Sequence, residues 1–415
     1  MRQILILFCF LVCIPVMTGC WNSSQRGIVD ILSQIQKKYA PDRRIAVFDV
    51  KVSRDGKLAV EGETSLVSAF SELDSILKEE YPKVDFRVKL LPSESLHSLT
   101  RGIITVSVAN LRPTPRHSAE LVTQAILGTP VKVLKKEDNW YLIQTPDSYL
   151  GWTTESSIFL CTEKGIPGYN NSGRIIYTDL TGTCYESPDE NSLPVSDIVA
   201  GSILKIIDSD KGFWEVKLPD GRSGYVYKNH CMQFKEWEES CIDKYVSAEH
   251  NSGSFDEHPA SGEVLAGEII ETAMKYLGLP YLWGGTSSKG LDCSGFTKTV
   301  YFMNGIILQR DASQQVLYGD LVDTRDNYDK LEPADLLFFG THETDSTSER
   351  VTHTGIYIGN GEIIHSSGFV KINSLIPGND NYNPGLEASF IRARRVLTCI
   401  GDPGIETVFS HELYK

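Results

Sequence analysis

An internal repeat constrains the fold of the middle of this 415-residue chain most strongly. An apolar run, a tryptophan, a Pro-Asp turn and a glycine-aromatic pair occur twice in the same order: Gly128–Leu134, Trp140, Pro146-Asp147 and Gly151-Trp152, then Gly201–Ile207, Trp214, Pro219-Asp220 and Gly224-Tyr225. Equivalent residues lie 73 or 74 positions apart, which indicates one inserted residue. Short strands bounded by Gly, Pro and Asp predict two copies of a small β-barrel, with Trp140 and Trp214 at one core position.

Several further domains are expected, because a chain of this length exceeds one ordinary hydrophobic core. Helix-like and strand-like patterns lie on both sides of the repeats, and polar stretches separate them. The expected order is a signal peptide at 1–19, a lipid-anchored linker at 20–26, a small α+β module at 27–98, two β modules at 99–162 and 163–236, a linker at 237–261, a second α+β domain at 262–400 and a C-terminal tail at 401–415.

The N-terminus predicts export. Arg2 precedes an apolar run over residues 4–16, which is too short to cross a bilayer comfortably and is typical of a signal peptide. Met17-Thr18-Gly19-Cys20 resembles the lipobox of bacterial lipoproteins, in which cleavage leaves a lipidated cysteine. Two or more acyl chains on Cys20 would anchor the protein stably to a membrane, in the periplasm or elsewhere in the cell envelope, and the sequence leaves open which face carries the anchor. The alternative is a plain secretory signal that ends near a chance cysteine.

Composition narrows the choice of partners. The net charge of -14 disfavours a nucleic-acid partner, because no broad basic surface can neutralise phosphates. No CxxC or HExxH motif is present, so a structural or catalytic zinc has no sequence support. With Cys293 kept free, five cysteines remain after the leader and Cys20, an odd number whose pairing the sequence leaves open. A monomer is expected.

Cys293 has the setting of a nucleophile. A Gly-rich loop over 284–291 precedes Asp292, a good helix N-cap, and Phe296 and Val300 mark one face of the following helix. A thiolate in the first turn of a helix is stabilised by the backbone N–H groups and the helix dipole. We therefore predict a thiol with a lowered pKa. A small buried core residue is the alternative.

The base is expected on a hairpin. Residues 351–358 alternate like a strand, 359–361 carry a turn signal, and residues 362–365 return. A three-residue loop would place His365 opposite Gly355 and on the same face as His353, whereas a two-residue loop would separate the histidines. We predict the three-residue loop, with His353 as base and His365 as its orienting partner.

Five motifs in order resemble the NlpC family of cell-wall cysteine peptidases: Pro280–Gly285, Leu291–Phe296, Gln309–Ala312 with Gln315, Pro333–Phe339 and His353–Gly359. The resemblance covers about residues 262–398, and the repeats, which resemble bacterial SH3-like domains, extend it to roughly 100–398. It implies an α+β fold with a papain-like catalytic domain. The family typically cuts between γ-D-glutamate and the diamino acid of peptidoglycan stem peptides, without a metal or cofactor.

The resemblance also implies roles for individual residues. Cys293, His353 and His365 match the triad, and Tyr281 matches an oxyanion tyrosine. Trp283, Asp292, Ser294 and Asp311 match substrate-binding positions, although packing and helix capping explain the first three equally well. Glu120 matches the residue that binds a free amino terminus in the subclass that releases L-Ala-γ-D-Glu, with Asp292 as a candidate second carboxylate. Ala312 replaces a Ser or Thr common in relatives.

Two other functions are compatible with these residues. A papain-like acyltransferase or amidase would share the Cys–His pair, and a non-catalytic lipoprotein would bind the wall through its SH3-like modules. Retention of all three triad positions counts against the second. The sequence leaves open whether Lys or diaminopimelate occupies the third stem position.

Overall fold

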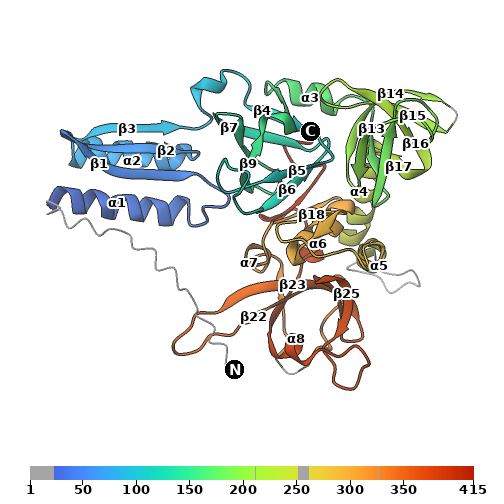
Figure 1. Ribbon diagram of the computed structural model, residues 1–415. Coiled ribbons are helices and arrows are strands. Elements are labelled where there is room, and N and C mark those ends of the chain that lie inside the picture. The colour runs from blue at the N-terminus through green and yellow to red at the C-terminus, as the bar shows by residue number, and fades with distance from the viewer. Residues whose placement is uncertain (1–22, 211, 251–260, 326) are drawn as a thin grey trace, which may run out of the picture. The chain divides into compact units, whose positions relative to one another are not determined.

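The computed structural model describes residues 23–210, 212–250, 261–325 and 327–415 (Figure 1). The predicted signal peptide and Cys20 lie outside these ranges. Within them, no helix is long and apolar enough to cross a membrane. The chain forms two compact units: residues up to Arg43 with Val47–Leu90, and Arg44–Ala46 with Leu91–Lys415.

The smaller unit is a three-stranded sheet packed with two helices. The strand order is β1-β2-β3, antiparallel across the β1–β2 hairpin and parallel between β2 and β3. Ala69, Leu73 and Leu77 recur every four residues and are buried, so one face of α2 contributes to the core. The elements are α1 (Ser23–Tyr39), β1 (Phe48–Asp55), β2 (Lys57–Thr64), α2 (Val67–Glu80) and β3 (Asp85–Leu90).

The larger unit begins with the two predicted β modules. The first has a five-stranded sheet in the order β10-β4-β7-β8-β9 and a β5–β6 hairpin, and the second has a seven-stranded sheet in the order β13-β12-β16-β15-β14-β11-β17. The first module contains β4 (Arg101–Ile104), β5 (Val108–Leu111), β6 (Thr123–Ile126), β7 (Pro130–Glu137), β8 (Trp140–Gln144), β9 (Leu150–Thr154) and β10 (Ile158–Cys161). The helix α3 (Gly165–Asn170) leads to β11 (Arg174–Tyr177), β12 (Thr181–Tyr185), β13 (Pro194–Val199), β14 (Ile203–Asp210), β15 (Phe213–Lys217), β16 (Ser223–Tyr227) and β17 (Cys231–Gln233).

The predicted repeat is confirmed, but the prediction that one copy carries an inserted residue is wrong. The strands β7, β8 and β9 superpose in sequence on β14, β15 and β16 with a constant offset of 73 residues. Trp140 is therefore equivalent to Phe213, and Trp214 to Tyr141. Because neighbouring strand residues point to opposite faces, the two tryptophans do not share one core position. Tyr141 and Trp214 pack in the cores of their own barrels.

The C-terminal domain packs helix α6 against one face of an antiparallel sheet, as a papain-like domain should (Figure 1). The strand order is β21-β26-β22-β23-β24-β25. The sheet contains β21 (Asp320–Val322), β22 (Leu336–Thr341), β23 (Arg350–Gly359), β24 (Glu362–Ser367), β25 (Phe369–Ser374) and β26 (Phe390–Arg395). The helices are α5 (Ser261–Lys275), α6 (Cys293–Met303), α7 (Ala312–Gln315) and α8 (Pro384–Ala388), and short strand pairs join β18 (Thr286–Ser287) to β19 (Gly290–Leu291) and β20 (Ile306–Leu308) to β27 (Ile405–Thr407).

Two expected connectors are part of this core. The predicted linker begins inside helix α4 (Phe234–His250), in which Trp237, Cys241 and Tyr245 are buried against α5 and α6. Their spacing of four residues forms an apolar helix stripe, which the polar residues around them concealed. The predicted tail is also structured: β27 pairs with β20, and the buried Tyr414 belongs to the same core.

Buried polar contacts attach the first barrel to the loop before α6. Gln124 Oε1 accepts hydrogen bonds from Thr286 N at 3.0 Å and Ser287 Oγ at 3.1 Å. Lys298 Nζ on α6 lies 2.6 Å from the carboxylate of Asp147, whose side chain is fully buried. The barrel is thereby fixed against the helix that carries Cys293.

Candidate active site

Cys293 is the first residue of α6 and is buried, with 8% of its surface exposed. Asp292 caps the helix, because its Oδ1 accepts a hydrogen bond from Gly295 N at 2.7 Å. The thiol Sγ lies 4.0 Å from the carbonyl oxygen of Thr352, the residue before His353. The nucleophile and the expected base therefore lie on adjacent elements.

A β-bulge in β23 orients the carbonyl group of Thr352. In the β22–β23 pair, Phe339 lies opposite His353 but Gly340 lies opposite Val351, so Thr352 is an extra residue in β23. Bulges bend a strand locally and redirect its groups, and they are common beside active sites. Here the bulge turns the backbone of Thr352 toward the sulfur.

The predicted low pKa of Cys293 is wrong for the resting site. Burial raises the pKa of the thiol to about 11, and the charge of Asp292 adds to the rise, while the backbone N–H groups of Thr354 and Ser294 oppose it. The helix N-terminus favours a thiolate, but burial of the thiol and the charge of the capping Asp292 outweigh it. The resting nucleophile is a neutral thiol.

The two histidines are hydrogen-bonded to each other. His353 Nε2 lies 2.7 Å from His365 Nδ1, and His365 Nε2 lies 3.0 Å from Oδ1 of Asn373 on β25. Burial lowers the pKa of His353 to about 3 and that of His365 to about 4. Both imidazoles are therefore neutral at neutral pH.

This chain of hydrogen bonds assigns the tautomers. Asn373 Nδ2 donates to the carbonyl of Asn381 at 3.1 Å, which orients the amide so that Oδ1 faces His365. An amide oxygen only accepts, so His365 carries its proton on Nε2 and accepts at Nδ1. His353 must then donate from Nε2, which leaves its Nδ1 as the unprotonated atom. Asn373 was missed in the sequence because its contact depends on a third strand.

The register predicted for the hairpin is confirmed, although its loop is not. Ile356 pairs with Ile364 and Tyr357 with Ile363, which places His365 opposite Gly355. A Cβ on Gly355 would lie 2.9 Å from the Cβ of His365, so glycine makes room for the ring. The loop has two residues, Asn360 and Gly361, both with positive φ, and a bulge next to it restores the register.

The first barrel contributes Glu120 to the same cleft, which has a volume of about 650 Å³ and is lined by Cys293, Tyr281 and Trp283. Trp283 is 63% exposed, and its Nε1 donates to Glu120 Oε1 at 2.6 Å. Burial raises the pKa of Tyr281 to about 12, so its hydroxyl stays protonated.

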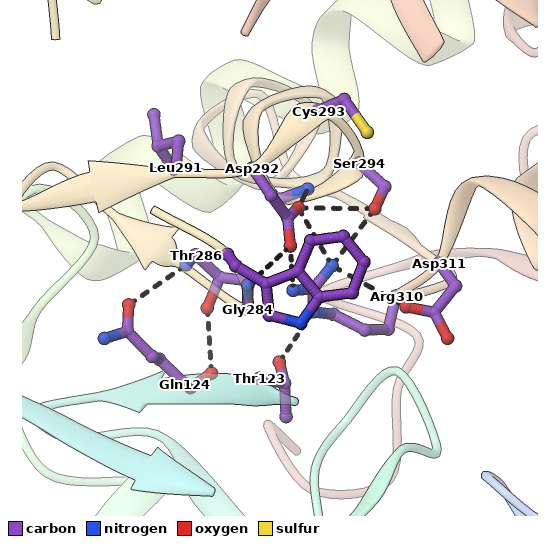
Figure 2. A network of polar contacts seen from close by, with 12 residues as sticks. Thr123, Gln124, Gly284, Thr286, Leu291, Asp292, Cys293, Ser294, Arg310 and Asp311 are labelled. Carbon is purple, nitrogen blue, oxygen red and sulfur yellow. Dashed lines mark hydrogen bonds and ion pairs between the residues drawn. The ribbon is translucent and has the colours of Figure 1, made fainter. Parts of the chain in front are cut away.

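Arg310 organises the floor of this site (Figure 2). It is only 1% exposed, and its guanidinium donates to both oxygens of Asp292, at 3.1 and 2.6 Å, and to Ser294 Oγ at 3.1 Å. Its Nε donates to Oγ1 of Thr123 in the first barrel at 3.0 Å. Asp292 and Ser294 line the cleft but are mostly buried, and the carboxylate of Asp292 is paired with Arg310. The motif containing Arg310 was identified in the sequence, but this role was not.

Asp311 lies at the edge of the cleft and caps α7. Its Oδ2 accepts hydrogen bonds from Arg44 Nη1 at 2.8 Å and from the hydroxyl of Tyr149 at 3.1 Å. The next residue, Ala312, is buried and offers no hydroxyl group.

Comparisons with known proteins agree with this geometry. Residues 278–392 match the model of the NlpC/P60 family, and residues 111–158 match that of the bacterial dipeptidyl-peptidase SH3 domain. A γ-D-glutamyl-L-lysine dipeptidyl-peptidase of Bacillus cereus is 32% identical over 67% of this chain and 76% of its own length. Dipeptidyl-peptidase 6 of Lysinibacillus sphaericus is 28% identical over 66% of this chain and 91% of its own.

The crystal structure of an NlpC/P60 family protein from Bacillus cereus has a TM-score of 0.54 and 27% identity, and it covers 71% of this chain and 99% of the other. The similarity therefore extends over nearly the whole length of a solved relative. The chain belongs to the NlpC/P60 family of cell-wall cysteine peptidases.

Proposed function

We propose that this protein hydrolyses the bond between γ-D-glutamate and the L-diamino acid of peptidoglycan stem peptides that have a free N-terminal L-Ala, releasing L-Ala-γ-D-Glu. The proposal is carried by the placement of Cys293, which shares a cleft with Glu120 of the first barrel and lies 4.0 Å from the backbone of Thr352. The next residue, His353, begins a neutral chain of hydrogen bonds through His365 to Asn373. Two relatives named as dipeptidyl peptidases support it.

Cys293, His353 and Tyr281 carry out the proposed hydrolysis. His353 Nδ1 takes the thiol proton as Cys293 attacks the γ-carbonyl, and the protonated Tyr281 hydroxyl donates to the developing oxyanion. The imidazolium then protonates the departing α-amine of the diamino acid. Water hydrolyses the thioester with His353 again acting as base.

Glu120 binds the free amino terminus of the substrate. An ammonium group that enters a partly closed cleft loses hydration and needs an acceptor with negative charge. Asp292 is already paired with Arg310, whereas Glu120 has only the neutral indole of Trp283 as a partner among the described residues, so Glu120 is the carboxylate left for the amine. Stems capped on L-Ala would lose this contact. We infer a role in the recycling of released wall peptides rather than in splitting the intact wall.

The test compares L-Ala-γ-D-Glu-L-Lys, its meso-diaminopimelate equivalent and their N-acetylated forms, with mass spectrometry of the released dipeptide. Cys293→Ala should abolish release. Glu120→Gln should lower kcat/KM for the free peptide about 10- to 100-fold, the range expected for one charge-assisted hydrogen bond. Glu155→Gln is a matched control, because Glu155 is an exposed glutamate of the same barrel that pairs with Lys136.

Equal kcat/KM for free and acetylated peptides would refute amine recognition. Transfer of the acyl group to an added amine in preference to water would favour an acyltransferase, and stem binding without turnover would favour a wall-binding protein.

We also propose that the protein is exported and anchored in the cell envelope through lipid on Cys20. Radiolabelled palmitate should enter the wild-type protein but not Cys20→Ser, and the variant should leave the membrane fraction. Retention of the label in Cys20→Ser would contradict the anchor.

A further inference from the structure

The ionisable side chains that line the cleft are almost all paired. Arg310 pairs with Asp292 at 2.6 Å, and Arg44 pairs with Asp311 at 2.8 Å. Glu349, on the hairpin that leads into β23, is paired with Arg392. Each of these pairs is close to electrically neutral.

Two charged residues of the cleft stand outside these pairs. Within the described part of the chain, Glu120 accepts a hydrogen bond only from the neutral indole of Trp283. Arg350 is exposed, and its side chain has no ion pair or hydrogen bond with any residue that the structure describes. The cleft therefore presents one unmatched anion from the first barrel and one unmatched cation from the catalytic domain.

Arg350 starts the strand that reaches the nucleophile. It precedes by two residues Thr352, whose carbonyl oxygen lies 4.0 Å from Cys293 Sγ. At the usual rise of a strand, two residues span about 7 Å. A long, flexible arginine at that distance can reach a group a few bonds away from the carbonyl under attack.

The proposed substrate carries the complementary charges. Its amino terminus is an ammonium group. The γ-linkage leaves the α-carboxylate of D-glutamate free, a few bonds from the scissile carbonyl. A tripeptide has a second carboxylate close to the scissile bond, on the diamino acid. In a protein with a net charge of -14, an anion needs a specific cation to enter a cleft.

We propose that Arg350 is a specificity-determining residue that binds the substrate carboxylate nearest the scissile bond, opposite in charge to the amine site at Glu120. This inference rests on the proposed function. A guanidinium group suits the task, because its planar N–H groups match a carboxylate in two parallel hydrogen bonds. Stem peptides whose carboxylate is amidated would then be poor substrates.

The experiment measures kcat/KM of the full-length protein and of Arg350→Gln on three peptides. These are L-Ala-γ-D-Glu-L-Lys, the same peptide with D-isoglutamine in place of D-glutamate, and the same peptide with a C-terminal amide. Arg325→Gln is the matched control, because Arg325 is an exposed arginine that pairs with Asp323 and does not line the cleft.

The expected result is a loss of about 10- to 100-fold in Arg350→Gln on the first peptide, the range for one charge-assisted hydrogen bond. The wild type should lose a similar factor on one amidated peptide, and Arg350→Gln should show no further loss on that peptide. Loss on D-isoglutamine identifies the α-carboxylate of glutamate, and loss on the C-terminal amide identifies that of the diamino acid.

Two outcomes overturn the inference: Arg350→Gln with wild-type kcat/KM, or a variant that still discriminates against both amides as strongly as the wild type. Failure of the wild type to cleave any of the peptides would instead refute the proposed function.

Discussion

Replacing Asn373 tests the tautomer assignment on which the base depends. In the wild type, Asn373 Oδ1 accepts from His365 Nε2 at 3.0 Å, which leaves Nδ1 of His353 unprotonated. In Asn373→Ala this preference disappears. His365 can then carry its proton on Nδ1 and donate to His353, whose own proton moves to the nitrogen that should accept from the thiol.

The expected fall in kcat of Asn373→Ala follows from the loss of one neutral hydrogen bond. Such a bond contributes about 1 kcal/mol net, which corresponds to a factor of about five in the ratio of tautomers. Looser orientation of the rings adds to this, so we expect kcat to fall about 5- to 20-fold. KM should stay the same, because Asn373 does not line the cleft.

Asn373→Asp separates this effect from simple packing. A carboxylate accepts the same hydrogen bond, so kcat near neutral pH should remain close to the wild-type value. Its negative charge favours protonated imidazole and raises the pKa of both histidines. Since activity needs neutral His353, whose pKa is about 3, the acid limb of kcat/KM should move to higher pH in this variant.

Steady-state release of L-Ala-γ-D-Glu between pH 4 and 9 measures both effects, and a thermal melt checks folding. An unchanged kcat in Asn373→Ala, together with an unchanged acid limb in Asn373→Asp, would refute the assignment.

Three other perturbations have defined outcomes. The alkylation rate of Cys293 by iodoacetamide should still rise between pH 8 and 10, because burial raises its pKa to about 11; a plateau below pH 7 would reveal a resting thiolate. His353→Asn should lower kcat about 10²- to 10⁴-fold, and His365→Asn should retain more turnover; the reverse order would exchange their roles. Lys298→Met leaves the buried carboxylate of Asp147 without its partner and should lower the free energy of unfolding by about 3–5 kcal/mol. The double variant Lys298→Met/Asp147→Leu should recover most of this loss. An unchanged denaturation midpoint in the single variant would contradict the prediction.

The sequence by itself determined those features of the protein that depend on residues close together in the chain. The repeat was readable because short strands and their turns recur at a fixed spacing. The helix that starts at Cys293 was readable from its cap and its apolar stripe. The alternation of residues 351–365 determined that His353 and His365 share a face, because side chains in a strand repeat every two residues.

Tertiary structure decided what depends on residues far apart in the chain. Asn373 comes from a third strand, and Arg310 meets Thr123 across a separation of 187 residues. The pKa of Cys293 reflects burial beneath several elements, which a helix N-terminus alone does not reveal. The ion pairs of the cleft join residues that lie far apart in the sequence. Only the folded structure therefore shows which charged side chains are left unpaired for the substrate.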